Sequence, residues 1–173
     1  MYRGLCESAP NNIYRFPGPI FLYARTHRVH GTFMTPHLSI TDQPIDIAAA
    51  LAAVQTDNAG AVNSFIGTVR NQSGGRPVRR LHYESYDSMA LTQLGHVVAQ
   101  AYEKWPMLQE VAVVHRKGTL ELGDVAVVVA VATPHRAESF AACQFIIDTL
   151  KQVVTIWKRE EYEDGTEWVA AHP

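Results

Sequence analysis

Hydrophobic and polar positions follow two alternating periods along the chain after residue 34. Strands are favoured by β-branched and aromatic residues or by two-residue alternation in four segments, namely 60–70, 78–86, 110–118 and 124–133. Helices are favoured by apolar residues at helical spacing in three segments, namely 44–55, 87–105 and 138–154. Asp164 and Gly165 form a turn-favouring dipeptide, so residues 156–171 are expected to close the chain with a hairpin.

The ends and connections of these elements carry signals of their own. Pro44 suits the first turn of a helix, with Thr41 or Asp42 as its cap. Two glycines and a proline indicate a mobile loop over residues 71–78, and 119–123 is expected to connect two strands. The third helix is expected to place four apolar side chains on one face: Phe140, Cys143, Ile147 and Leu150.

Three helices among strands of this kind predict an α+β domain with a mostly antiparallel sheet. The expected strand edges are not protected by charged residues throughout, so a dimer formed through sheet or edge contacts is plausible. Residues 1–33 differ, since they are rich in proline and glycine and show no sustained periodicity. We expect 1–33 to be an N-terminal extension that contributes little to function, and 34–173 to be the functional domain.

Composition narrows the classes of function. The 173 residues are 47% hydrophobic and 18% charged, which is typical of a folded globular protein. The formal net charge of -2 argues against a nucleic-acid binder. Cys6 and Cys143 form no metal-ligand pattern, and Cys143 is expected to be a small buried hydrophobic residue. We therefore expect a cytoplasmic protein with no membrane segment, no bound metal and no cofactor.

Cationic side chains lie beside apolar or glycine-rich sequence at several places. Arg70 ends an expected strand before the glycine-rich loop, where a guanidinium can pair with phosphate; the alternative is a solvated strand end. His135 and Arg136 open the third helix, whose first turn offers free N–H groups to an anion. His115–Arg116 lacks a helix start, so a structural role is expected there.

Two lysines flank an apolar stretch near the C-terminus. Lys151 lies near the end of the third helix, where a cation is favourable even without a function. Lys158 follows Trp157 directly, and one alternative makes it a surface residue on a strand whose tryptophan faces inward. If these lysines and the arginines surround one pocket, they would repel one another and attract a phosphate strongly.

Several long stretches resemble the large, catalytic subunit of molybdopterin synthase, the molybdenum cofactor biosynthesis protein E family. They run in family order and spacing over roughly Ile40 to Val169: "FIGTVRNQSGG", "LHYESYDSMA", "VAVVHRKGTLELGDVAVVVAVATPHRAESFAACQFIIDTLK" and "IWKREEYEDGTEWV". The resemblance implies an α/β-hammerhead-like fold that dimerises, and a sulfurtransferase activity. Its substrate would be cyclic pyranopterin monophosphate, which receives two sulfurs to form the dithiolene of molybdopterin.

The resemblance also implies partners and site residues. The sulfur donor would be a small ubiquitin-like subunit with a thiocarboxylated Gly-Gly C-terminus, in a heterotetramer built on a central homodimer. The implied catalytic residues are Lys151 and Lys158, which also belong to the implied substrate-binding set: Thr68, Val69, Arg70, His135, Arg136, Lys151, Lys158, Arg159 and Glu160. Family members commonly have proline where this chain has Thr155, so the end of the third helix is expected to be less firmly fixed.

The resemblance implies separate tasks for these side chains. Arg70, His135 and Arg136 would hold the phosphate and pterin. Lys151 would meet the incoming thiocarboxylate, where it would shuttle a proton or stabilise negative charge. Lys158 would give electrostatic support and bind the partner's terminal carboxylate.

Other classes of function fit the residues less well. The main alternative is a non-catalytic module that binds a phosphorylated ligand or a ubiquitin-like tail, since it would show similar cations. An enzyme that hydrolyses phosphate esters is disfavoured because no nucleophile elbow or acidic metal cluster is visible.

Overall fold

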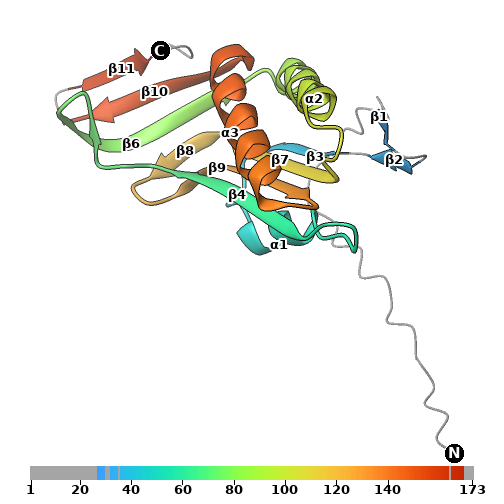
Figure 1. The fold of residues 1–173 in the computed structure, drawn as a ribbon. Coiled ribbons are helices and arrows are strands. Elements are labelled where there is room, and N and C mark those ends of the chain that lie inside the picture. The colour runs from blue at the N-terminus through green and yellow to red at the C-terminus, as the bar shows by residue number, and fades with distance from the viewer. Residues whose placement is uncertain (1–26, 30–31, 35, 164, 170–173) are drawn as a thin grey trace, which may run out of the picture.

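The computed structural model describes residues 27–29, 32–34, 36–163 and 165–169. Within these ranges the chain forms an α+β fold with eleven strands and three helices, as expected (Figure 1). The helices are α1 (Ile47–Ala52), α2 (Asp87–Lys104) and α3 (Arg136–Val153). The strands are β1 (His27–Val29), β2 (Thr32–Met34), β3 (His37–Thr41), β4 (Ala61–Thr68), β5 (Gln72–Ser73), β6 (Arg76–Ser85), β7 (Glu110–Arg116), β8 (Gly118–Glu121), β9 (Val125–Thr133), β10 (Ile156–Tyr162) and β11 (Gly165–Val169).

The main sheet has the order β3-β7-β9-β4, in which only the β3–β7 pair is parallel. Helices α2 and α3 cover one face of it and the short helix α1 packs on the other (Figure 1). Neighbouring residues of β9 therefore pack against opposite faces of the sheet, in different hydrophobic clusters. Val127 and Val129 pack under α2 and α3, whereas Val128 and Ala130 face α1. Burial on both faces explains why this strand is an unbroken apolar run.

The second sheet is wholly antiparallel, with the order β11-β10-β6-β5 and with β8 also paired to β6. Two expectations were wrong here, because residues 71–78 form a tight β5–β6 hairpin and residues 119–121 belong to a strand. Gly74 and Gly75 have φ of 55° and 80°, which suits the two-residue turn that joins β5 to β6. The pairing that makes β8 a strand is distant in sequence, since Leu120 lies opposite Leu81.

The cap of α1 and the buried face of α3 differ from expectation. Asp46 caps α1 by accepting a 3.0 Å hydrogen bond from the Ala49 N–H. The expected cap, Thr41 or Asp42, lies too early in the chain, because β3 ends at Thr41 and α1 begins only at Ile47. Phe140 is 64% exposed and does not join the buried face of α3. The helical repeat places Phe140 about 20° around the axis from Lys151, at the margin of the apolar stripe.

Strand β4 is an edge of the main sheet and carries no charged residue. Val62 and Ile66 on this strand are 47% and 39% exposed. Phe140 adds a third exposed apolar side chain on α3, which packs against β4. An unprotected apolar edge of this kind is suited to pairing with another chain.

Three further expectations concern the cysteines, the chain ends and membranes. Cys143 is 3% exposed as expected, and burial raises the pKa of its thiol to about 11, whereas Cys6 lies outside the described residues. The expected boundary after residue 33 falls inside β2, which pairs with β1, and this division of the chain stays a prediction. Within the described ranges, no helix is both long and apolar enough to cross a membrane.

Candidate functional site

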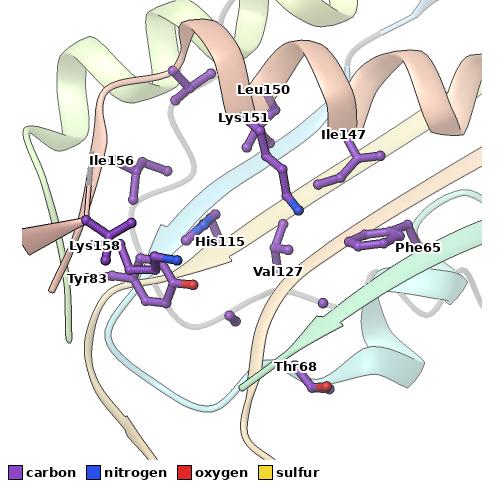
Figure 2. A pocket seen from close by; sticks show the side chains of 14 residues that line it. Phe65, Thr68, Tyr83, His115, Val127, Ile147, Leu150, Lys151, Ile156 and Lys158 are labelled. Atoms are coloured by element: carbon purple, nitrogen blue, oxygen red, sulfur yellow. The ribbon is translucent and has the colours of Figure 1, made fainter. Parts of the chain in front are cut away.

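Two adjoining hollows lie between the C-terminal end of α3, the end of β4 and the inner face of the second sheet. Figure 2 shows the side chains that line the first of them. The first, of about 320 Å³, we call the apolar hollow; its lining includes Val127, Ile147, Leu150 and Ile156. The second, of about 330 Å³, we call the polar hollow; its lining includes Arg70, Gln72, Ser73 and Glu160. Six residues line both hollows and so form their junction: Phe65, Gly67, Thr68, Tyr83, Lys151 and Lys158.

Lys151 reaches this junction from the last turn of α3. Its ammonium lies 5.7 Å from the centre of the Phe65 ring, and Figure 2 shows the side chain pointing into the apolar hollow. The residue is nevertheless exposed to solvent. An exposed ammonium beside an aromatic face avoids the cost of full burial and remains able to meet an incoming anion.

Strand alternation brings Lys158 to the same junction. Lys158 and Glu160 point toward the hollows, whereas Trp157 is 42% exposed on the outer face. The alternative with an inward tryptophan and a surface lysine is therefore wrong. Arg159 also faces outward, with its guanidinium 5.3 Å from the centre of the Trp168 ring, and it lines neither hollow.

Charge is unevenly balanced around the junction. Lys158 is paired with the Glu160 carboxylate at 2.8 Å. Arg70 and Lys151, by contrast, have no carboxylate within ion-pair distance among the residues that the structure describes. The uncompensated positive charge of the polar hollow thus belongs to Arg70 and Lys151, which makes these two side chains the candidates for binding an anion.

His115 and Tyr83 form a neutral wall of the apolar hollow. Their rings meet edge to face with centres 5.1 Å apart, and His115 Nδ1 lies 2.9 Å from the Arg116 carbonyl oxygen. Because that oxygen only accepts, Nδ1 carries the hydrogen of the neutral imidazole. Burial, with the charge of Lys151 adding to it, lowers the pKa of His115 to about 4. Burial also raises the pKa of Tyr83 to about 12, so both rings are uncharged near neutral pH.

The buried imidazole predicts a specific acid sensitivity. In the unfolded chain His115 takes up a proton near pH 6.5, but in the folded protein only near pH 4. Stability that is present above pH 6.5 is therefore lost as the pH falls toward 4, by on the order of 3 kcal/mol. His115→Phe keeps a ring in place and removes this titration, so denaturant unfolding should show a flatter decline between pH 7 and 4. An unchanged decline in His115→Phe would contradict this assignment.

Two hydrogen bonds hold the chain just after α3 at Thr155, the position where the family resemblance implies a proline. The Gln93 side-chain oxygen accepts a 2.8 Å hydrogen bond from the Thr155 N–H, and its amide donates to the Thr155 hydroxyl at 3.1 Å. Gln93 belongs to α2, which packs against α3. The Thr155 N–H and hydroxyl are thus both hydrogen-bonded, one turn after Lys151, and the expectation of a less firmly fixed helix end stays a prediction.

The remaining implied site residues lie in different places. Thr68 lines both hollows. Val69 is 3% exposed in a small core, and its backbone bonds to Asp124 and Gly123. His135 and Arg136 stand at the start of α3, which puts Arg136 about 22 Å along the helix axis from Lys151. A single chain thus gathers Thr68, Arg70, the two lysines and Glu160, but not His135 and Arg136.

Sequence reasoning missed several residues around the hollows, and four of them carry polar groups that the site uses. They are Ser73, Tyr83, His115 and Tyr162. Strand alternation could have placed Tyr83 and Tyr162 on the inner face, but no local pattern shows that β6 and β10 are neighbours. Within the described ranges, no group of histidine, cysteine and acidic residues is suited to hold a metal ion.

Comparison with known proteins identifies the family to which the chain is similar. The sequence model of the family described as MoaE protein matches residues 40–153. The molybdopterin synthase catalytic subunit of Halalkalibacterium halodurans is 47% identical over 131 residues, which cover 76% of this chain and 83% of that protein. Molybdopterin synthase catalytic subunit 1 of Mycobacterium tuberculosis is 41% identical over 138 residues, or 80% of this chain and 93% of that protein.

Solved structures share the fold. The crystal structure of molybdopterin synthase from Staphylococcus aureus superposes with a TM-score of 0.73 at 36% identity, covering 76% of this chain and 95% of that one. A complex of subunits 1 and 2 of molybdopterin-converting factor from Helicobacter pylori superposes at 0.65, with 79% and 93% coverage. At 20% identity the second match shows the fold alone.

Proposed function

The chain belongs to the MoaE protein family, and from this premise we propose that it is the catalytic subunit of a molybdopterin synthase. It transfers two sulfur atoms to cyclic pyranopterin monophosphate and so forms the dithiolene of molybdopterin. Its partner is a small ubiquitin-like subunit whose C-terminal Gly-Gly carries the sulfur as a thiocarboxylate. The convergence of Arg70, Lys151 and Lys158 on one pair of hollows is the observation that carries this proposal.

Two anions must meet for this reaction, and the two hollows suit them. Arg70 offers a fork of donors to the phosphate in the polar hollow, with the Thr68 hydroxyl beside it. The apolar hollow, walled by neutral His115 and Tyr83, suits the flat pterin ring. Lys151 and Lys158 stand at the junction, where the partner's thiocarboxylate reaches the pterin side chain.

The residues at the junction support the chemistry of transfer. The thiocarboxylate sulfur forms a bond to a carbon of the pterin side chain while a carbon–oxygen bond of that carbon breaks, and the displaced oxygen leaves on the phosphate or as water. A water molecule then breaks the acyl–sulfur bond through a tetrahedral intermediate. The partner is left with an ordinary carboxylate and the sulfur remains on the pterin. Lys151 stabilises the oxyanion of that intermediate or passes a proton to it, and Lys158 holds the partner's terminal carboxylate.

We propose that His135 and Arg136 complete this site from a second copy of the chain. Helix α3 follows β9 after a short turn, and β9 is antiparallel to β4, so α3 runs parallel to β4. If two β4 edges pair antiparallel about a two-fold axis, the start of one α3 comes beside the end of the other. In that arrangement the partner protomer's two side chains come next to Arg70 and Lys151. The exposed Val62 and Ile66 support this edge as the contact.

The proposed function is tested by reconstitution. The purified chain, a thiocarboxylated small subunit and cyclic pyranopterin monophosphate are mixed, and the dithiolene product is detected after chemical conversion to a fluorescent pterin. We expect product in proportion to the thiocarboxylate supplied, and a native mass of two large and two small subunits. Binding of both ligands without product would instead support the non-catalytic binding module. The same proposal places the protein in the cytoplasm, in keeping with the free buried thiol of Cys143.

A further inference from the structure

The Glu160 carboxylate is held from several sides at the floor of the polar hollow. Glu160 is 2% exposed, and its Oε1 lies 2.8 Å from the Lys158 ammonium. The Tyr162 hydroxyl donates a hydrogen bond to Oε2, and the Ser73 hydroxyl also bonds the carboxylate. We call Ser73, Tyr162 and Glu160 the Glu160 clamp. Its three residues come from β5 and β10, on either side of β6.

Tyr162 cannot easily swing away from this carboxylate. Its ring is 6% exposed within the small core of the second sheet, packed with Val78 and Leu81. The Arg76 guanidinium lies 3.7 Å from the centre of the ring on one side. The hydroxyl is therefore presented to Glu160 by a side chain that packing holds in place.

This arrangement determines where the Lys158 ammonium lies. The Tyr162 hydroxyl occupies Oε2 and the Ser73 hydroxyl contacts both Glu160 and Tyr162, so Oε1 stays directed toward Lys158. One hydrogen of the ammonium is thereby used, and the others are left for the junction of the two hollows. A cation that is held before the substrate arrives stabilises developing negative charge without the cost of reorganisation.

We propose that Tyr162 and Ser73 are positioning residues of the sulfur-transfer site, which act by fixing Glu160 and, through it, the Lys158 ammonium. The inference rests on the proposed function, because it assigns these residues a role in that reaction. Neither residue belongs to the substrate-binding set that the family resemblance implies. Both act through another side chain.

The pH dependence of activity separates positioning from simple structural support. Burial alone would raise the pKa of Glu160, but hydrogen bonds from Lys158, Tyr162 and Ser73 and the Lys158 charge outweigh it, so the pKa is lowered. The other charged or titratable groups near the carboxylate are Tyr83 and Arg76 on β6, Arg70 after β4, and Lys151 on α3. The clamp needs ionised Glu160, so activity is lost as the pH falls through this lowered pKa. Removing a hydroxyl donor raises that pKa and moves the acid limb to higher pH.

The experiment compares Tyr162→Phe and Ser73→Ala with Glu167→Gln as the matched control. Phenylalanine keeps the ring under Arg76 and removes only the hydroxyl, while Glu167→Gln breaks the exposed Arg76 ion pair and leaves the clamp intact. We expect each clamp variant to lower kcat about ten- to hundredfold with little change in KM, and to shift the acid limb of kcat upward. Glu167→Gln should keep the wild-type profile. Unchanged kcat and acid limb in both clamp variants would overturn the proposal.

A second measurement does not depend on turnover. In protein labelled with ¹⁵N at lysine Nζ, the Lys158 signal is identified by its absence in Lys158→Arg. We expect this ammonium to exchange slowly with solvent in the wild type and faster in Tyr162→Phe and Ser73→Ala. Equal exchange in all three proteins would refute the clamp even if activity fell. If the wild type forms no product, the proposed function fails, while the exchange rates still decide whether the clamp positions Lys158.

Discussion

Replacing Lys151 by alanine should lower the rate of dithiolene formation by about 10²–10³-fold, the usual effect of removing one preorganised charge from an active site. Lys151 lines both hollows and has no carboxylate partner among the described residues, so its charge is available to the reacting groups. The measurement is single-turnover product formation with saturating thiocarboxylated partner. Folding is checked by the thermal midpoint, which should change little because the residue is exposed.

A matched control exists at the end of the other long helix. Lys104 occupies the last turn of α2, as Lys151 occupies the last turn of α3, but its ammonium lies over Trp105 and Phe145, away from the hollows. Lys104→Ala removes an equivalent helix-end charge and should leave turnover near the wild-type rate. If Lys104→Ala and Lys151→Ala lowered the rate equally, a general electrostatic effect would replace the specific role.

Lys151→Arg separates the two roles that the geometry allows. Arginine keeps the positive charge but does not give up a proton at accessible pH. If Lys151 acts by charge alone, the arginine variant should recover most of the activity that alanine loses. If Lys151 passes a proton, the arginine variant should stay close to alanine. Full activity in Lys151→Arg would rule out the acid–base role.

A mixed dimer of Lys151→Ala and Arg136→Ala protomers should regain activity that neither parent homodimer has. In the proposed two-fold arrangement, each site takes Lys151 from one protomer and Arg136 from the other. A heterodimer then contains one site with both defects and one intact site, so about half of the wild-type rate should return. The two chains are co-expressed with different tags, the heterodimer is isolated by tandem affinity purification, and product formation is measured with the small subunit present.

The control for this experiment pairs two defects on the same side of the site. Arg70 and Lys151 line the polar hollow of one protomer, so a heterodimer of Arg70→Ala and Lys151→Ala has no intact site and should stay inactive. Activity in this control would show that Arg70 and Lys151 reach one site from different protomers, against the arrangement proposed here. An inactive Lys151→Ala with Arg136→Ala heterodimer would contradict a site shared between protomers that pair through β4.

Local sequence patterns predicted most of the fold because most elements are defined by their own residues. The run at 124–133 is apolar enough to be a strand on its own, and α2 carries its buried stripe within one helix. Strand β8 escaped prediction because only its distant pairing with β6 defines it. Phe140 was assigned to the core because the helical period does not show how far around α3 the sheet extends.

The residues of the candidate site also fall into those that local sequence indicates and those that only distant contacts bring to the site. Their positions beside apolar or glycine-rich sequence made Arg70, Lys151 and Lys158 candidates, the family resemblance implied their roles, and the structure brings these three together. His115 was expected to be structural, because nothing in its own segment shows that the end of α3 lies beside it and forms a hollow with it. Tyr162 and Ser73 are 89 positions apart and meet only because both flank Glu160, so no local reading could join them.

The paired hydrogen bonds between Gln93 and Thr155 also constrain how this sequence can change over evolutionary time. Proline at position 155 would have neither the N–H nor the hydroxyl that the glutamine uses. Acquired alone, it would leave the partly buried Gln93 amide without these partners, so a replacement at position 93 has to come first or at the same time. The order of these two substitutions is therefore constrained, because exchanging either residue alone is disfavoured.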